Sequence, residues 1–277
     1  MRKEDLRIRD PFIFCENGLY YLLGSSGNDP WNKGSDMMLY YSTDLENFEE
    51  QGKMVDDDTF AGYRMLYAPE MHKYNGKYYL IISAYRDDVG RGSFILVSDS
   101  LTGKFKMLTG EYITPKGWDC LDSTLFVYEG KPYLYFGNSW DDAITGDGDG
   151  AVFVMPLSDD LTHATGKPKK ITSGKYCGFA RALQNTKARG YVAEAPWVMH
   201  GEDGAIVLLW STFTPEGYCI SRNISTTGAM GEYEFDTLVF NQNGGHSMVF
   251  DDLEGKHRII FHHPNNSPNE RLKIMDY

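Results

Sequence analysis

A repeated unit of about 55 residues is the feature that most constrains the fold of this chain. Each copy has a polar residue, a short apolar stretch, a glycine turn and a second stretch rich in aromatic residues. Residues 68–72 and 76–83 form one such copy. Two β-prone stretches joined by a glycine turn are typical of a β-hairpin. The sequence therefore predicts five hairpins, whose turn glycines are Gly18, Gly76, Gly130, Gly204 and Gly255.

Most copies continue into a third strand that ends in a Ser-Asp turn, as at residues 39–45. Several strands per unit, repeated at this period, are typical of propeller blades. We therefore predict an all-β fold, a single five-bladed β-propeller domain over residues 1–277. The wider spacing before Gly204 predicts an insertion at residues 174–190. The last blade is short in sequence, so either residues 1–8 complete it or it lacks its outermost strand.

Composition limits the partners and the compartment. The net charge of −12 argues against nucleic acid and against a membrane surface, because both repel an acidic protein. No apolar run approaches the roughly 20 residues of a membrane span, and the first residues show no signal-peptide pattern. The four cysteines are scattered, which indicates free thiols in a reducing compartment. We expect a cytoplasmic protein, and the sequence does not indicate its oligomeric state.

Polar residues stand at the starts of four of the five repeats. In a propeller the first strand of each blade lines the central axis, so these residues should converge at one end of the channel. Buried carboxylates repel one another and are costly to desolvate, which favours a functional role over a structural one. Exposed rim residues or metal ligands are the alternatives. The residues are Asp10, Asp122, Glu194 and His246, whereas the second repeat has Ala68.

Glu194 lies between two alanines and just before Pro196 and Trp197. Apolar surroundings raise the pKa of a carboxyl group and can keep it protonated near neutral pH. A protonated glutamate is suited to act as a general acid, and a general acid requires a base on the other side of the reacting bond.

The ordered set of motifs resembles the glycoside hydrolases of family 43, the five-bladed β-xylosidases, α-L-arabinofuranosidases and arabinanases. The resemblance covers essentially the whole chain, and the set is specific although each piece alone is weak. The matching pieces lie at residues 9–13, 67–72, 121–123, 193–197 and 244–250.

The resemblance implies that Asp10 is the general base, Glu194 the general acid, and Asp122 the residue that tunes the pKa of Glu194 and orients it. His246 stands where family members place an axial histidine, often near a bound calcium ion, so a structural calcium ion is implied there. No cofactor is implied for the chemistry itself. Ala195 departs from the family, which usually has glycine at this position, and adds a methyl group beside the acid.

Five further residues are candidates for substrate binding. Tyr67, Trp140 and Trp197 could stack on sugar rings, although aromatic residues also pack propeller cores. Tyr67 stands where many relatives of the family carry tryptophan. Glu70 is a rival acid, and we favour a strand-end or substrate-contacting role for it. Arg271 could bond a sugar hydroxyl, although an arginine on the surface is the more common situation.

We therefore predict a glycosidase that acts on oligo- or polysaccharides containing xylose or arabinose. The first and fourth blades are not neighbours, which favours a wide separation of the two carboxyl groups and hence an inverting mechanism. A cytoplasmic address would favour short imported oligosaccharides and exo action. The alternatives are a carbohydrate-binding propeller without catalysis and a retaining hydrolase of the fructan or sucrose type.

Overall fold

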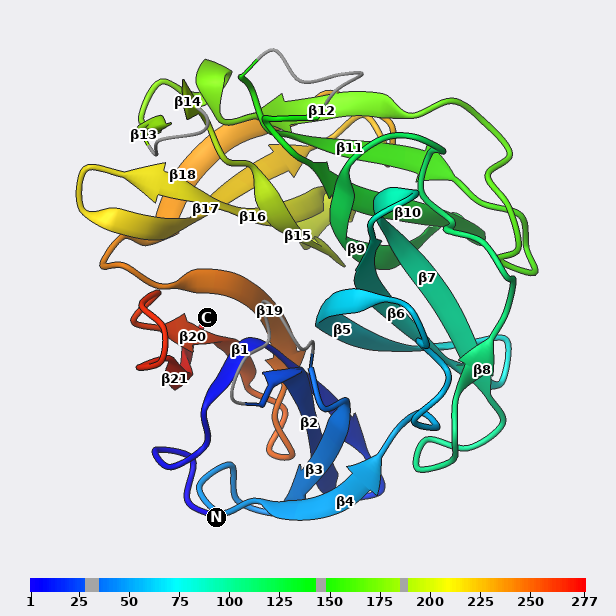
Figure 1. Ribbon diagram of the computed structural model, residues 1–277. Helices are drawn as coiled ribbons and strands as arrows, with labels where there is room; N and C mark the ends of the chain where they lie inside the picture. The colour runs from blue at the N-terminus through cyan, green and yellow to red at the C-terminus, as the bar shows by residue number, and fades with distance from the viewer. Residues whose placement is uncertain (28–34, 143–147, 185–188) are drawn as a thin grey trace.

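A computed structural model describes residues 1–27, 35–142, 148–184 and 189–277. Almost all of its regular structure is β-strand, arranged as five antiparallel sheets around a central axis (Figure 1). The prediction of a five-bladed β-propeller is therefore confirmed. The innermost strands of neighbouring blades contact one another around the whole ring.

The sheets are built in chain order from the axis outward. The innermost strands are β1 (Ile8–Glu16), β5 (Arg64–Tyr74), β9 (Cys120–Tyr128), β15 (Glu194–His200) and β19 (Gly245–Asp251). The second strands are β2 (Leu19–Ser26), β6 (Lys77–Arg86), β10 (Lys131–Asn138), β16 (Ile206–Thr214) and β20 (His257–His263). The third strands are β3 (Met38–Ser42), β7 (Gly90–Ser98), β11 (Ala151–Pro156), β17 (Gly217–Ser225) and β21 (Arg271–Asp276). The fourth strands are β4 (Glu49–Lys53), β8 (Lys106–Met107), β12 (Lys169–Ser173) and β18 (Glu234–Phe240).

The turn after each innermost strand explains the repeated glycine. Gly18, Gly76 and Gly130 have φ of 75–77°, and the residue before each of them also has a positive φ. Two consecutive residues with positive φ make the tight turn whose twist matches a β-hairpin, and glycine adopts this conformation without steric cost.

The hydrophobic core lies between the blades. Each cluster of buried side chains draws on adjacent sheets; for example, Phe126 and Tyr135 of the third blade pack with Trp210 of the fourth. A sheet with two buried faces needs apolar side chains on both, which accounts for the aromatic-rich second strands.

The fifth blade has three strands in the described chain, and β21 pairs only with β20 there. The N-terminal segment joins the first blade, where Arg2 pairs with Asn47 and the Phe48 N–H donates to the Met1 carbonyl over 2.8 Å. Of the two expectations for the last blade, the missing outermost strand is the one found. The first and last blades are joined by side chains, described below.

The segment predicted as an insertion lies outside the blade sheets. It contains a 3₁₀ turn, η1 (Lys175–Cys177), and the two short strands β13 (Leu183–Gln184) and β14 (Arg189–Gly190). Residues 185–188 of this segment lie outside the described residues. A second 3₁₀ turn, η2 (Glu202–Gly204), connects β15 to β16.

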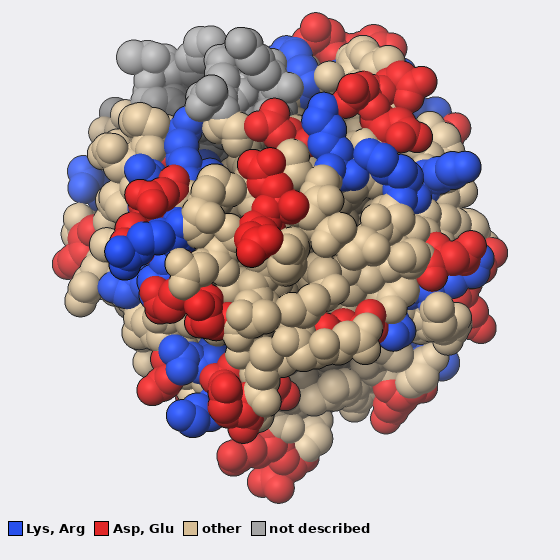
Figure 2. Space-filling view, turned by 90° about the horizontal axis from the view of Figure 1, so that it is seen from below, with Lys and Arg blue, Asp and Glu red and all other residues tan. Residues whose placement is uncertain are grey.

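On the face shown in Figure 2, acidic and basic side chains intermingle, with uncharged surface between them. The negative net charge therefore does not form one acidic patch on that face. None of the helical segments in the described chain has the length and apolar character of a membrane span.

Candidate active site

A β-bulge interrupts every innermost strand near its start. The residue at the bulge has a positive φ, between 50° and 57°, in all five blades. The strand pairing slips at the same place in each blade. A bulge re-aims side chains at the end of a strand, and here it does so five times around one axis. The bulge residues are Asp10, Ala68, Asp122, Ala195 and His246.

This register corrects the alignment of the fourth repeat by one residue. Ala195, and not Glu194, is the counterpart of Asp10. Glu194 precedes the bulge and pairs with Ser211, as Arg9 pairs with Ser25 and Tyr67 with Ser83. The prediction that Glu194 and Asp10 occupy equivalent positions was therefore wrong, although both residues reach the same pocket.

Ala195→Gly is expected to stabilise the protein by about 1 kcal/mol, because only glycine adopts this left-handed conformation without a clash at Cβ. Ala195 has a φ of 55° and is buried. The melting temperature should rise by about 1–3 °C in calorimetry. The matched control is Ala193→Gly, two residues away and equally buried, which should lower the melting temperature. Equal losses in both variants would contradict the strain argument.

A chain of hydrogen bonds joins each blade to the next at the bulge. A serine on the second strand accepts the bulge N–H of the following blade: Ser25 from Ala68 over 2.8 Å, and Ser83 from Asp122 over 2.8 Å. Ser211 accepts from His246 over 2.9 Å. His262 holds the same position in the last blade, and its Nδ1 accepts the Asp10 N–H over 3.2 Å. This bond helps to close the ring.

The third blade has Gly137 where the others have serine or histidine. A Cβ at Gly137 would lie 3.3 Å from both the Ala193 carbonyl oxygen and the Glu194 Cα, so the glycine leaves room for the backbone of Glu194. The Ala195 N–H donates to Asp122 Oδ2 instead, over 3.2 Å. Asp122 therefore positions the backbone next to Glu194 directly.

The bulge side chains open into a pocket of about 330 Å³ at one end of the channel. Asp10, Asp122, Glu194 and His246 all line it, so the predicted convergence of these four residues is found. Tyr67 and Trp140 also line it. The remaining lining residues are Arg9, Arg91, Leu121, Leu183, Val192, Phe213, Asn265 and Ser267.

Asp10 is held as a carboxylate. Its Oδ1 lies 3.0 Å from His246 Nδ1, and its Oδ2 accepts a hydrogen bond from Ser25 Oγ over 2.6 Å. Burial alone would raise the pKa of Asp10, but the charges of His246 and Arg9 outweigh it and hold this pKa well below its usual range. Burial likewise opposes the charge on His246, but Asp10 and Asp122 raise the pKa of the imidazole to about 9.

The pKa of Glu194 is shifted in the direction opposite to that of Asp10. Burial raises the pKa of its carboxyl group, and this effect exceeds the opposing hydrogen bond that Tyr218 donates to Oε1 over 2.7 Å. Asp122 is also affected, because burial and the nearby charge of Glu194 raise its pKa to about 7. The pocket therefore holds one carboxyl group stabilised as an anion, Asp10, and two whose pKa is raised, Glu194 and Asp122. Carboxyl groups shifted in opposite directions are what acid–base chemistry needs.

His262 and Tyr218 connect Asp10 to Glu194. Their rings stack with centroids 5.7 Å apart, and both side chains are buried. Tyr218 bonds the carboxyl group of Glu194, whereas His262 accepts the backbone N–H of Asp10. Burial and the charge of Arg9 lower the pKa of His262 to about 3, so its imidazole is neutral, as an acceptor at Nδ1 must be.

The described residues do not fit a calcium ion held by His246. They contain no group of three or more His, Cys, Asp or Glu side chains arranged around a common metal position. The Nδ1 of His246 faces Asp10, and calcium is bound by oxygen ligands, which an imidazole does not supply. The prediction of calcium near His246 therefore finds no support in this part of the chain.

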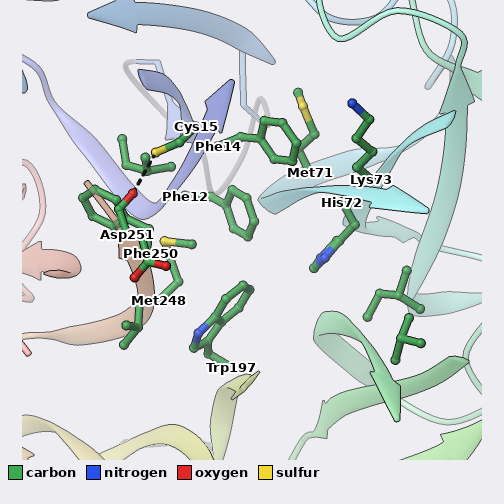
Figure 3. A pocket seen from close by; sticks show the side chains of 14 residues that line it. Phe12, Phe14, Cys15, Met71, His72, Lys73, Trp197, Met248, Phe250 and Asp251 are labelled. Atoms are coloured by element: carbon green, nitrogen blue, oxygen red, sulfur yellow. Dashed lines mark hydrogen bonds between the residues drawn. The ribbon is translucent and has the colours of Figure 1, made fainter. Parts of the chain in front are cut away.

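Trp197 lies away from the carboxyl groups. It lines a second pocket, of about 410 Å³, formed by residues further along the same innermost strands (Figure 3). Its indole packs edge-on against Phe12, with ring centroids 5.6 Å apart, and stacks on His72. Trp197 is not among the described residues that line the pocket of Asp10, and its stacking on a sugar ring stays a prediction.

Glu70 and Arg271 are likewise not among the described residues that line the pocket of Asp10. Glu70 is buried, and its Oε2 lies 3.0 Å from His72 Nε2. Arg271 donates from Nε to the Glu4 carbonyl over 2.8 Å and from Nη1 to the carbonyl of Glu270. Through its bond to Glu4, Arg271 joins the last blade to the N-terminal segment.

Several pocket residues were not predicted. Arg91 donates to Tyr67 over 2.9 Å and makes two bonds to Asp119, so Tyr67 is fixed by a charged pair. Arg91 is the second residue of β7, the third strand of its blade, where no repeated motif marks it. Arg9 directly precedes Asp10 within the matching piece at residues 9–13, so it had a sequence signal.

The comparisons with known proteins identify the family of the chain. A family model described as glycosyl hydrolases family 43 matches residues 5–274. An endo-arabinase from Bacteroides thetaiotaomicron VPI-5482 is 31% identical, with a TM-score of 0.89, over 100% of this chain and 96% of the other. No curated protein matches the chain.

Two more distant structures share the fold. An α-L-arabinofuranosidase from Lactobacillus brevis is 17% identical, with a TM-score of 0.73, over 100% of this chain and 94% of the other. A β-xylosidase/α-arabinofuranosidase from a compost microbial metagenome, solved with xylotriose in a calcium-free form, is 20% identical, with a TM-score of 0.73, over 99% and 92%. The family match over nearly the whole sequence, together with the first relative, shows that the chain belongs to glycosyl hydrolases family 43 and is a glycosidase.

Proposed function

We propose that this glycosidase hydrolyses arabinose- or xylose-containing glycans with inversion, using Asp10 as general base and Glu194 as general acid. The observation that carries the proposal is the contrast between the two carboxyl groups in one pocket. Asp10 is stabilised as an anion, whereas burial favours the proton on Glu194.

In the proposed step, Asp10 accepts a proton from a water molecule whose oxygen attacks the anomeric carbon. The bond from that carbon to the glycosidic oxygen breaks, and Glu194 gives its proton to the leaving oxygen. Asp122 accepts the Ala195 N–H and so positions the backbone next to Glu194. Proton exchange with solvent then restores both carboxyl groups.

The relative with 31% identity is an endo-arabinase, which makes linear arabinan the first substrate to test. Wild-type enzyme should be assayed on linear arabinan, aryl α-L-arabinofuranoside and aryl β-D-xyloside, with Asp10→Asn as the blank. A series of oligosaccharides released from arabinan would establish endo action, and release of single sugars would establish exo action. Turnover of none of these substrates would refute the proposal.

Stereochemistry is a separate test of the mechanism. Inversion requires that the first sugar released has the anomeric configuration opposite to that of the substrate. Proton NMR of the early products detects this before mutarotation. Release of the same anomer would show a retaining enzyme and would remove the assignment of Asp10 as a base.

Tyr218→Phe is expected to move the basic limb of the pH–activity profile upward by about one pH unit. Tyr218 donates a hydrogen bond to Glu194, which favours the ionised carboxylate and lowers the pKa of Glu194. Without that bond the pKa rises further. Because a general acid works only when protonated, kcat/KM should then persist to higher pH.

Tyr135→Phe is the matched control, since it also removes a buried phenol, one that bonds the Ala229 carbonyl far from the pocket. The basic limb of the pH–activity profile of Tyr135→Phe should stay at the wild-type position. A downward shift in Tyr218→Phe would mean that Tyr218 stabilises the protonated acid instead.

A further inference from the structure

The two aromatic side chains that stand out as exposed in the described chain line one groove at the edge of the propeller. Tyr176 is 76% exposed and Phe235 is 50% exposed. The groove holds about 310 Å³ and is lined by strands β12 and β18, the outermost strands of the third and fourth blades, and by η1. Buried packing accounts for most aromatic residues of this chain, but it does not account for these two.

The groove also carries polar groups. Lys170, Thr172 and Ser173 line it from β12, and Asn223 lines it from β17. Ser173 is buried, and its Oγ has no hydrogen-bond partner among the described residues. The polar side chains that line the groove therefore come from two neighbouring blades, through β12 and β17.

Aromatic faces beside hydroxyl, amide and ammonium groups match the two sides of a sugar ring, which has apolar C–H faces and a rim of hydroxyls. A protein partner would more typically meet a larger apolar patch. A sugar is therefore the ligand that this mixture of groups fits best.

One segment connects the groove to the active site. The chain between β12 and β15 contributes Tyr176 to the groove and Leu183 and Val192 to the pocket of Asp10. Phe179 of the same segment packs against Phe235, with ring centroids 5.0 Å apart, which fixes the segment to the fourth blade. A glycan held at the groove would thus be kept near the pocket.

We propose that the groove of Tyr176 and Phe235 is a secondary binding site for the polysaccharide chain, separate from the catalytic pocket. The inference rests on the proposed function in one respect, that the substrate is a polysaccharide of arabinose or xylose. A second contact raises the local concentration of the chain at the pocket, so it benefits polymers and not short substrates.

Affinity gel electrophoresis tests binding without hydrolysis. Asp10→Asn protein is run in native gels containing linear arabinan, xylan or no polysaccharide. We expect retardation in at least one polysaccharide gel, and a clear loss of that retardation when Tyr176→Ala and Phe235→Ala are added. Absence of retardation in both gels, or equal retardation of both proteins, would overturn the proposal.

Kinetics give an independent readout in the otherwise wild-type enzyme. The Tyr176→Ala/Phe235→Ala variant should lose about five- to tenfold in kcat/KM on the polymer, with a much smaller loss on a trisaccharide. Leu253→Ala, at an exposed apolar residue of the fifth blade (41% exposed), is the matched control. Its kcat/KM should be unchanged on both the polymer and the trisaccharide. Equal losses on both substrates would overturn the proposal.

The two proposals fail separately. Wild-type enzyme that is retarded through Tyr176 and Phe235 but cleaves none of the substrates would refute the proposed function and leave the binding site standing. Hydrolysis of arabinan, together with unchanged retardation and unchanged kinetics in the Tyr176→Ala/Phe235→Ala variant, would refute the binding site and leave the proposed function standing.

Discussion

Asp10→Asn is expected to lower kcat/KM about a thousandfold on every substrate that the wild-type enzyme cleaves. Asparagine keeps the size of the side chain and can still accept from Ser25, but it cannot take a proton from water. Glu194→Gln should lower kcat/KM by a similar factor on glycans, because their leaving oxygen needs a proton. Both are measured as steady-state rates on arabinan and on aryl glycosides.

The leaving group distinguishes the acid from the base. On a dinitrophenyl glycoside, whose phenolate leaves without a proton, Glu194→Gln should recover most of its activity. Asp10→Asn should not recover, because the attacking water still lacks its base. If both variants recover, or neither does, the two assignments are wrong.

Glu70→Gln is the matched control for both. Glu70 is another buried carboxyl group on an innermost strand, but its partner is His72, and it is not among the described residues of the pocket. We expect it to keep at least a tenth of wild-type activity. A thousandfold loss of kcat/KM in Glu70→Gln, with little loss in Glu194→Gln, would show that Glu70 and not Glu194 is the general acid.

The blades could be predicted from the sequence because their signals are local. Gly18, Gly76 and Gly130 each stand in a two-residue turn that only a hairpin uses, and the spacing of these turns sets the number of blades. The position of Glu194 was missed by one residue. Prolines 11, 69 and 196 follow three of the bulge residues and would have aligned Ala195 with Asp10.

The partners of the carboxyl groups could not be predicted in the same way. Tyr218 and His262 lie on the third and second strands of different blades, and they meet only when those blades pack side by side. The direction of Trp197 depends on the bulge before it, which arises where β15 pairs with β16. Such contacts depend on tertiary packing and leave no periodic trace in the sequence.

The closure of the ring depends on a buried ion pair that the sequence also did not reveal. Glu270 is fully buried, at 0% exposed, and its Oε1 accepts from Arg9 Nη1 over 2.8 Å and from Ser267 Oγ. Arg7 lies 3.8 Å from its Oε2. The pair joins the last blade to the first, one residue away from Asp10, in a propeller whose fifth blade has no fourth strand in the described chain.

Glu270→Gln is therefore expected to destabilise the protein by about 3 kcal/mol, because a buried arginine would face a neutral amide in place of a carboxylate. The melting temperature should fall by roughly 3–9 °C. Glu46→Gln is the control: it breaks the exposed pair with Lys3, which also ties the N-terminal segment to the first blade. It should cost less than about 1 kcal/mol.

The pH dependence identifies the charge as the cause. Burial raises the pKa of Glu270, but its bonds with Ser267 and Arg9 outweigh burial and lower the pKa below its ordinary value. The stabilisation from this carboxylate is thus fully present above its unfolded-state pKa of about 4.3 and is lost as the pH falls through the folded-state pKa. The gap in melting temperature between wild type and Glu270→Gln should accordingly be full at pH 7 and narrow as the pH drops below about 4. A gap that stays constant with pH would instead assign the loss to packing around the side chain, because the shape of the amide does not titrate and the charge of the carboxylate does.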